Sequence, residues 1–213
     1  MNKYCPECGN KLEDKDMHIV FILDESGSMG SIWDSTIDAV NEYFNAQKLE
    51  EGKTWVTLVK FDTEFRPLYS FTPLEDIKPL TRETYTPRGM TALHDAIGKT
   101  IHEHKNRKHV KTVFVVMTDG GENSSREYNL HTVKSLVENQ KRHGWDFVFL
   151  GANIDSYNVG GNYGFNTTVN WKATDMGVQN LTRAVASYST TYRTSGVSVG
   201  SVVLQDLVDN GDN

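Results

Sequence analysis

Three unbroken apolar runs, residues 19–23, 113–117 and 147–150, constrain the fold of this chain more than any other feature. A run without polar alternation is typical of a β-strand that is covered on both faces. Around these runs, apolar residues recur every three or four positions, which is the period of an amphipathic helix. Strands that alternate with helices favour parallel βαβ units. The sequence therefore predicts a Rossmann-like α/β fold, with a doubly wound, mainly parallel sheet and helices on both faces.

Other patterns add detail to this sheet. Polar residues 62–64 separate a strand-like segment at 55–61 from another at 67–71, which predicts a hairpin and one antiparallel edge strand. A last short strand is expected at residues 167–171. Residues 160–164, Gly-Gly-Asn-Tyr-Gly, are interpreted as a flexible loop. Helices are predicted from apolar stripes that begin at Trp33, Leu93, Leu130 and Val178.

The length of 213 residues suits one substantial domain with a buried core. Residues 1–16 are polar and are predicted to be an N-terminal Cys-x-x-Cys appendage. Residues 17–193 contain all of the predicted strands and helices. Residues 194–213 are predicted to be an irregular C-terminal tail, although they include the apolar stretch 202–204.

Composition narrows the range of functions. The formal net charge is −6 and no basic stripe is present, so we do not expect a nucleic-acid partner. No apolar stretch approaches the length that spans a bilayer, and no signal-peptide pattern follows Met1. We therefore expect no membrane association and a cytoplasmic location, or a virion location if a phage encodes the chain.

A polar loop, Asp24-Glu25-Ser26-Gly27-Ser28, directly follows the first apolar run. Alternate residues point the same way as a chain leaves a strand, so Asp24, Ser26 and Ser28 are expected to converge. Three hard oxygen donors at one point suit Mg²⁺, Ca²⁺ or Mn²⁺. The alternative is an ordinary polar turn, because Asp, Ser and Gly are the usual turn residues.

Two further loops are predicted at the same edge of the sheet. In doubly wound folds, ligands bind beyond the carboxyl ends of the strands. Asp119 follows the apolar run at 113–117, and Thr91 precedes the helix that begins near Ala92. Thr91 is also a natural N-cap for that helix, which is its alternative role.

These residues resemble the pattern of the von Willebrand factor A domain family: Asp-x-Ser-x-Ser after the first strand, a threonine before a middle helix, and an aspartate after the fourth strand. The resemblance covers residues 17–193, and residues 145–153 look like the fifth-strand segment of small stand-alone bacterial and phage members. It implies a complete metal-ion-dependent adhesion site, made of Asp24, Ser26, Ser28, Thr91 and Asp119.

In that family the serines, the threonine and the aspartates hold a divalent ion, directly or through water. A carboxylate from a partner protein then completes the coordination. The resemblance therefore implies a metal-dependent protein-binding module, with Mg²⁺ as the preferred ion and an unidentified protein supplying an Asp or Glu.

The Cys5-Pro6-Glu7-Cys8 turn resembles one knuckle of a zinc ribbon, but the chain has only two cysteines. Zn²⁺ shared between two chains of a homo-oligomer is one interpretation, and a pair of ordinary reduced thiols is the other. His18 is the nearest additional ligand, although it is expected to pack in the first strand. The histidines of the second helical stripe, His94, His102, His104 and His109, are interpreted as solvated.

Two other functions stay open beside the binding module. One is a structural or virion assembly component in which the metal stabilises the fold or a subunit contact. The other is a metal-assisted hydrolase, for which Glu25 and Glu122 are the available bases. No catalytic residue is assigned, because Ser26 and Ser28 have no histidine nearby in the sequence and would be occupied as metal ligands, and we expect a protein that is not an enzyme.

Overall fold

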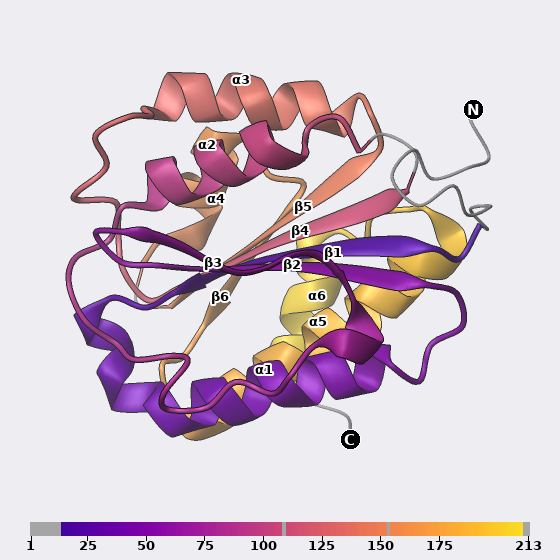
Figure 1. Ribbon diagram of the computed structural model, residues 1–213, viewed down its shortest axis with the longest axis horizontal. Coiled ribbons are helices and arrows are strands. Elements are labelled where there is room, and N and C mark those ends of the chain that lie inside the picture. The colour runs from indigo at the N-terminus through magenta and orange to yellow at the C-terminus, as the bar shows by residue number, and fades with distance from the viewer. Residues whose placement is uncertain (1–13, 108–109, 153, 211–213) are drawn as a thin grey trace.

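The computed structural model describes residues 14–107, 110–152 and 154–210 and contains a six-stranded sheet (Figure 1). The strand order is β3-β2-β1-β4-β5-β6, and every neighbouring pair is parallel except β2 and β3. This arrangement confirms the predicted fold class, including the antiparallel edge strand. The strands are β1 Met17–Asp24, β2 Thr54–Phe61, β3 Phe65–Pro73, β4 Lys111–Thr118, β5 Trp145–Ala152 and β6 Thr167–Trp171.

Helices cover both faces of the sheet, as predicted. Figure 1 shows α2, α3 and α4 on one side and α1, α5 and α6 on the other. Two short 3₁₀ helices, η1 Gly27–Ile32 and η2 Leu74–Asp76, lie in the connections. The α-helices are α1 Trp33–Gln47, α2 Leu93–His104, α3 Leu130–Lys141, α4 Ser156–Tyr163, α5 Asp175–Ser195 and α6 Ser201–Asn210.

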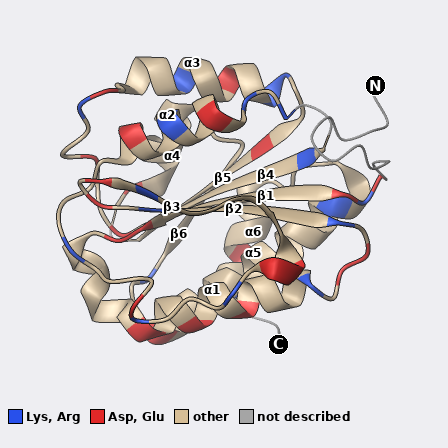
Figure 2. Ribbon diagram, in the orientation of Figure 1, with Lys and Arg blue, Asp and Glu red and all other residues tan. Residues whose placement is uncertain are grey.

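The central position of β1 in the sheet explains why its sequence shows no alternation of polar and apolar residues. All of its residues are buried. Ile19, Phe21 and Leu23 pack in the apolar layer with α1 and α5, whereas Val20 and Ile22 pack in the layer with α2 and α3. Burial of each such side chain contributes about 1.5–3 kcal/mol. Figure 2 shows that the charged residues of the central strands lie at or near the ends of those strands, away from the apolar middle of the sheet.

Two sequence-based predictions are wrong. The predicted irregular tail is wrong for its described part, residues 194–210, which contains α6 with Leu204 and Val208 buried in the core. Residues 160–164 are not a flexible loop, since α4 includes residues 160–163 and Gly164 is its C-cap. The signals of α4 are local: the Asp155 side chain caps its N-terminus, and Gly164 ends it with a φ of 79°.

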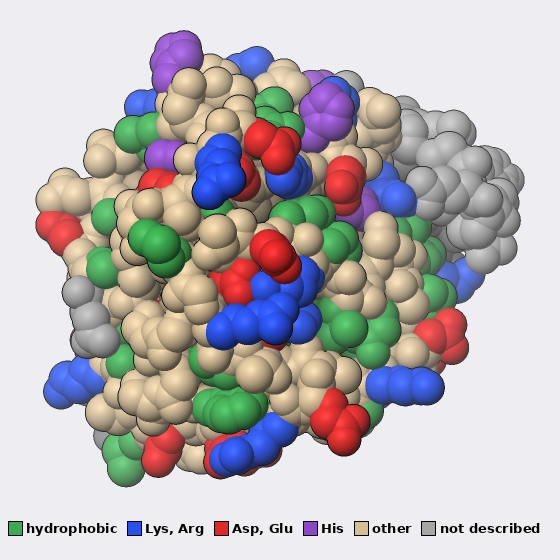
Figure 3. Space-filling model, turned by 60° about the vertical axis from the view of Figure 1, so that its left-hand side comes forward, with side chains coloured by type: hydrophobic (Ala, Val, Ile, Leu, Met, Phe, Trp, Pro, Cys, Tyr) green, Lys and Arg blue, Asp and Glu red, His purple; other side chains and the backbone are tan. Residues whose placement is uncertain are grey.

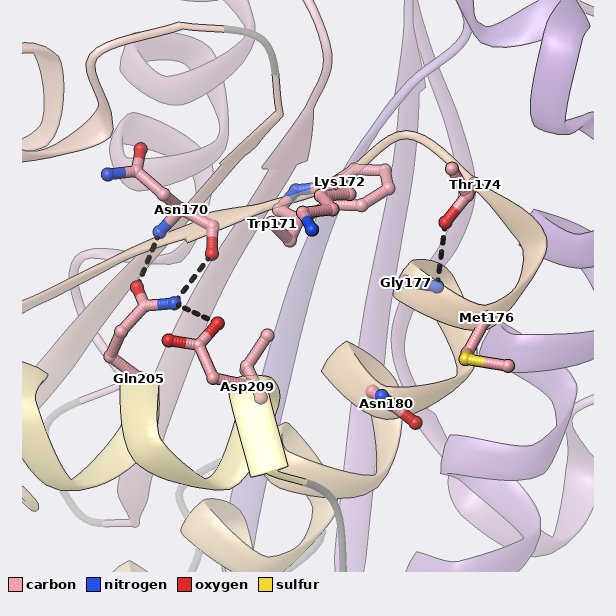
Figure 4. A pocket seen from close by; sticks show the side chains of 10 residues that line it. Asn170, Trp171, Lys172, Thr174, Met176, Gly177, Asn180, Gln205 and Asp209 are labelled. Carbon is pink, nitrogen blue, oxygen red and sulfur yellow. Dashed lines mark hydrogen bonds between the residues drawn. The ribbon is translucent and has the colours of Figure 1, made fainter.

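The C-terminal helix also covers the free edge of β6 (Figure 4). The Gln205 side chain accepts a hydrogen bond from Asn170 N and donates one to Asn170 O, both at 2.9 Å. Ser201 Oγ accepts from Thr168 N at 3.0 Å. Side chains of a helix thus replace the ladder bonds of a seventh strand, which protects an edge that would otherwise pair with other chains. Beside these contacts lies a cavity of about 360 Å³ that Trp171 and Met176 also line.

Within the described residues, no helix has the length and apolar character that a membrane span requires. Cys5 and Cys8 lie outside those residues, as does His109.

Candidate metal site

Three loops meet where the carboxyl ends of the central strands emerge. β1 and β4 are parallel neighbours, and Leu23 is paired with Met117 in their register. The loop that follows β1 and the loop that follows β4 therefore start side by side. The third loop, which precedes α2, is attached to the first through a bond from Gly27 N to Gly89 O of 3.3 Å. This end of the sheet is turned toward the viewer in Figure 3, and Gly27 and Ser28 of the first loop are exposed.

Four of the five predicted ligand residues are joined by hydrogen bonds. Ser28 Oγ donates to Asp119 Oδ1 at 2.6 Å, and it lies 3.2 Å from Ser26 Oγ. The Asp24 carboxylate accepts from Ser26 N at 2.7 Å and from Thr118 Oγ1 at 2.5 Å. The side chains of residues that are about 90 positions apart in the sequence therefore form one polar cluster.

Thr91, the fifth predicted ligand residue, borders the same space. Gly120 follows Asp119 and has no side chain to fill that space. A β-carbon placed on Gly120 would lie 3.2 Å from Thr91 Oγ1, 3.9 Å from Ser28 Oγ and 4.0 Å from Asp24 Oδ2. Oxygen atoms from three loops thus surround a gap that a glycine keeps open.

The donor set at this gap fits a hard divalent cation. It consists of two carboxylates and three hydroxyls, with no sulfur or imidazole ligand, and such oxygen sets favour Mg²⁺, Ca²⁺ or Mn²⁺. Among the described residues, no cluster of three or more His, Cys, Asp or Glu side chains has metal-ligand spacing. The proximity of the five residues is a structural fact, and their binding of a metal stays a prediction.

The alternative role of Thr91 as the N-cap of α2 is wrong. The N-cap position is Ala92, and the free N–H groups of the first turn are bound from the loop after β4. His94 N donates to Glu122 Oε2 at 2.8 Å, and Asp95 N donates to Ser125 Oγ at 3.1 Å. The Thr91 hydroxyl is therefore not used for capping.

Asn123, in the loop after β4, binds the backbone of Thr91. Thr91 N donates to Asn123 Oδ1 at 2.8 Å, and Asn123 N donates to Thr91 O at 3.0 Å. Sequence reasoning missed this residue and also Thr118 and Tyr85, whose hydroxyl donates to Asp24 O at 2.7 Å. Their roles depend on contacts across loops, for which the sequence has no periodic signal.

Asp24 and Asp119 form a pair of buried carboxylates, which we call the site pair. Asp24 is fully buried and Asp119 is 8% exposed. Burial raises the pKa of Asp24 to about 6, and the nearby charge of Asp119 adds to this effect. Burial also raises the pKa of Asp119. In the described part of the chain, no Lys, Arg or His lies within ion-pair distance of either carboxylate.

A second pair of carboxylates, Glu25 and Asp62, lies beside the site pair, and we call it the neighbour pair. Glu25 accepts from Lys60 Nζ at 3.0 Å, from Arg66 Nη1 at 2.7 Å and from Thr86 N at 2.6 Å. Asp62 accepts from Arg66 Nη2 at 2.5 Å. Figure 3 shows basic and acidic side chains gathered in the middle of this face. The neighbour pair is therefore neutralised by cations of the chain itself.

The predicted histidine environments are only partly correct. His18 is fully buried in β1, as expected, and its ring lies edge-on to Phe71. His102 is exposed. His104 is buried, which contradicts the prediction that it is solvated, because it lies on the face of α2 that points toward the sheet.

Comparisons with known proteins agree with this fold. The sequence matches the von Willebrand factor type A domain over residues 18–162, and no curated protein matches the chain. Proximal thread matrix protein 1 from the mussel byssus has a TM-score of 0.59 and 13% identity, over 82% of this chain and 46% of that one. A von Willebrand factor type A protein from Catenulispora acidiphila has a TM-score of 0.57 and 11% identity, over 82% of this chain and 42% of that one.

A mutant of the PilB minor pilin from Streptococcus sanguinis has a TM-score of 0.56 and 14% identity, over 97% of this chain and 65% of that one. The chain thus spans less than two thirds of each of these three structures, and such low identities show the fold alone. The domain match, in contrast, extends over more than half of the sequence, from β1 into α4. The chain belongs to the von Willebrand factor type A domain family.

Proposed function

We propose that the chain is a divalent-metal-dependent protein-binding module. The observation that carries this proposal is the site pair, Asp24 and Asp119, which has hydroxyl neighbours but no cation from the described chain. Two buried carboxylates repel each other and lose hydration, so a bound cation would stabilise them. The members of this family often depend on a metal and mediate protein interactions, which supports the same proposal.

Mg²⁺ is the proposed ion, and Ca²⁺ and Mn²⁺ suit the same oxygen atoms. Ser26, Ser28 and Thr91 would offer neutral hydroxyl oxygens, while Asp24 and Asp119 would supply the negative charge. A divalent ion held this way offers an electrophilic centre for a carboxylate of a partner protein. Such a charge-assisted contact at the centre of an interface confers specificity.

We propose binding in preference to hydrolysis because the two carboxylates suggested as bases are engaged elsewhere. Glu25 is held by Lys60 and Arg66. Glu122 Oε2 accepts from His94 N, and Glu122 Oε1 accepts from Ser125 N at 2.7 Å. Both carboxylates stabilise loops, and a general base needs a free lone pair within reach of a substrate.

A structural or virion assembly role is the second candidate. Two of the fold relatives are, by name, a thread matrix protein from the mussel byssus and a minor pilin. In this alternative the metal stabilises the fold or a contact in a homo-oligomer. The intracellular location and zinc binding by Cys5 and Cys8 rest on the sequence alone and stay predictions.

A peptide with a single acidic residue separates these candidates. We would titrate the full chain with acetyl-Gly-Gly-Glu-Gly-Gly amide in the presence of Mg²⁺ and again with excess EDTA, and follow amide chemical shifts. The binding module predicts Mg²⁺-dependent shifts at residues 24–28, 88–91 and 119–121. A rise in melting temperature with Mg²⁺, without any peptide-induced shift, would support the structural role and contradict the binding module.

A further inference from the structure

Arg88 lies on the loop that carries Thr91 and is attached to the proposed metal loop through its backbone. Arg88 N donates to Glu25 O at 2.7 Å, and Glu25 stands between Asp24 and Ser26. This short main-chain hydrogen bond fixes the backbone of Arg88 next to the site, independently of the conformation of its side chain.

Three cations, Lys60, Arg66 and Arg88, lie beside the neighbour pair, and Arg88 is the one whose side chain is mainly exposed to solvent. It is 60% exposed, compared with 21% for Arg66 and 12% for Lys60. Its ion contact within the described chain joins Nε to Asp62 Oδ2 at 3.4 Å, and Arg66 already holds that same oxygen at 2.5 Å. The two terminal nitrogens of Arg88 are therefore not needed to neutralise the neighbour pair.

The loops around Arg88 and the site hydroxyls are rich in glycine. Gly27 lies between Ser26 and Ser28 and donates its N–H to Gly89 O at 3.3 Å, and an added β-carbon on Gly121 would meet no atom within 4 Å. Met90, on the same loop as Arg88, is 52% exposed. A segment laid across this glycine-rich surface would meet the hydroxyls, an apolar side chain and a cation in one short span.

We propose that Arg88 is a specificity residue that binds a second carboxylate of the partner, so that the preferred partner segment carries two acidic side chains. This inference rests on the proposed function, in which the first carboxylate binds the metal. The guanidinium presents a planar pair of donors that matches a carboxylate, and this pre-organised geometry reduces the freedom that is lost for each hydrogen bond formed. Two linked contacts raise the overall affinity, because the second contact forms within the complex that the first has already made.

The test compares single-acid and double-acid peptides on the Mg²⁺-loaded full chain. The single-acid probe is acetyl-Gly-Gly-Glu-Gly-Gly amide. The double-acid probes carry two Glu residues separated by zero to four Gly residues, because the optimal spacing is set by the distance from the metal to Arg88. Affinity is measured by chemical-shift titration for the wild type, for Arg88→Gln and for the control Arg142→Gln. Arg142 ends α3 at the opposite edge of the sheet, so its removal changes net charge equally but leaves this face intact.

We expect the wild type to bind the best double-acid peptide about tenfold more tightly than the single-acid peptide. In Arg88→Gln this preference should fall to about twofold, which is the statistical factor for two equivalent carboxylates. Arg142→Gln should keep the tenfold preference. Mg²⁺ affinity should be unchanged in both variants, which shows that the site itself is intact.

Two results would overturn the inference while leaving the proposed function in place. The first is a double-acid preference that survives in Arg88→Gln. The second is an equal loss in Arg142→Gln, which would assign the preference to overall charge. If wild-type protein with bound Mg²⁺ binds neither kind of peptide, the proposed function itself is wrong, and this inference falls with it.

Discussion

The site pair and the neighbour pair place four carboxylates at the same edge of one sheet, yet their charges are balanced in opposite ways. Glu25 and Asp62 are neutralised by Lys60 and Arg66. Asp24 and Asp119 have hydroxyl and backbone donors alone. Both pairs are buried, so both need compensation. In the proposed function, the neighbour pair serves the fold and the site pair holds a cation from outside the chain.

The largest effect on the free energy of unfolding is expected when the neighbour pair is disrupted. Glu25→Ala leaves Lys60 and Arg66 without their main partner in a largely buried place. We expect a loss of about 3 kcal/mol in the free energy of unfolding, at the lower end for a buried pair because Arg66 is partly exposed. Urea unfolding with and without Mg²⁺ should show the same loss. The control is Glu64→Ala, since Glu64 is 73% exposed and should change stability by less than about 0.5 kcal/mol. Equal losses in both variants would remove the distinction between the pairs.

The next largest effect concerns the site pair. Asp119→Asn retains the size of the side chain and removes one negative charge, so we expect Mg²⁺ affinity to fall about 100-fold. At 100 times its Kd, Mg²⁺ should stabilise the wild type by about 2.7 kcal/mol, and at the same Mg²⁺ concentration this gain should fall to about 0.4 kcal/mol in the variant. Calorimetric titration and thermal unfolding measure the two quantities. In metal-free buffer the variant should be at least as stable as the wild type, because it removes one of two buried like charges, and a strong loss of stability there would make Asp119 structural.

A third kind of compensation sharpens the comparison, because Asp95 is balanced mainly by backbone donors, with a smaller contribution from the charge of Lys99. It accepts from Arg126 N, Glu127 N and Tyr128 N at 2.8 to 2.9 Å. Burial alone would raise the pKa of Asp95, but these three donors outweigh burial and lower it. We expect Asp95→Asn to lose about 2 kcal/mol near neutral pH.

The pH dependence of this loss follows from the sign of the shift. Because the folded pKa lies below the unfolded value of about 3.9, the contribution of Asp95 is complete above that value and disappears as the pH falls through the folded pKa. Urea unfolding between about pH 7 and pH 2 should show the wild type and Asp95→Asn converging at low pH. A constant difference across that range would contradict this account.

The smallest effect is expected at Thr91. Its hydroxyl borders the gap beside Gly120 and does not cap α2. We expect Thr91→Ala to weaken Mg²⁺ binding about tenfold, or 1.4 kcal/mol, with metal-free stability changed by less than about 0.5 kcal/mol. Glu122→Ala is the matched variant, since Glu122 does bind the first turn of α2 and should lower metal-free stability instead. An unfolding defect in Thr91→Ala would reverse these roles.

The strands were predictable because burial on both faces leaves a direct mark on composition. The apolar run in β1 follows from the two layers that Phe21 and Ile22 face. α4 and α6 were missed because their apolar stripes are short and glycine or polar residues interrupt them. α6 is stabilised by tertiary contacts instead, through Leu204 in the core and Gln205 on the edge of β6.

The sequence by itself determined which residues could form the site. Asp24, Ser26 and Ser28 alternate after a buried strand, and Asp119 follows the strand that pairs with it, so simple sheet geometry brings them together. Only the tertiary structure decided which carboxylates keep their charge unpaired. Glu25 is adjacent to Asp24 in the sequence, but its partners Lys60 and Arg66 come from the β2–β3 hairpin. Charge compensation depends on distances of a few ångströms between distant segments, and the periodicity of a sequence carries no information on such distances.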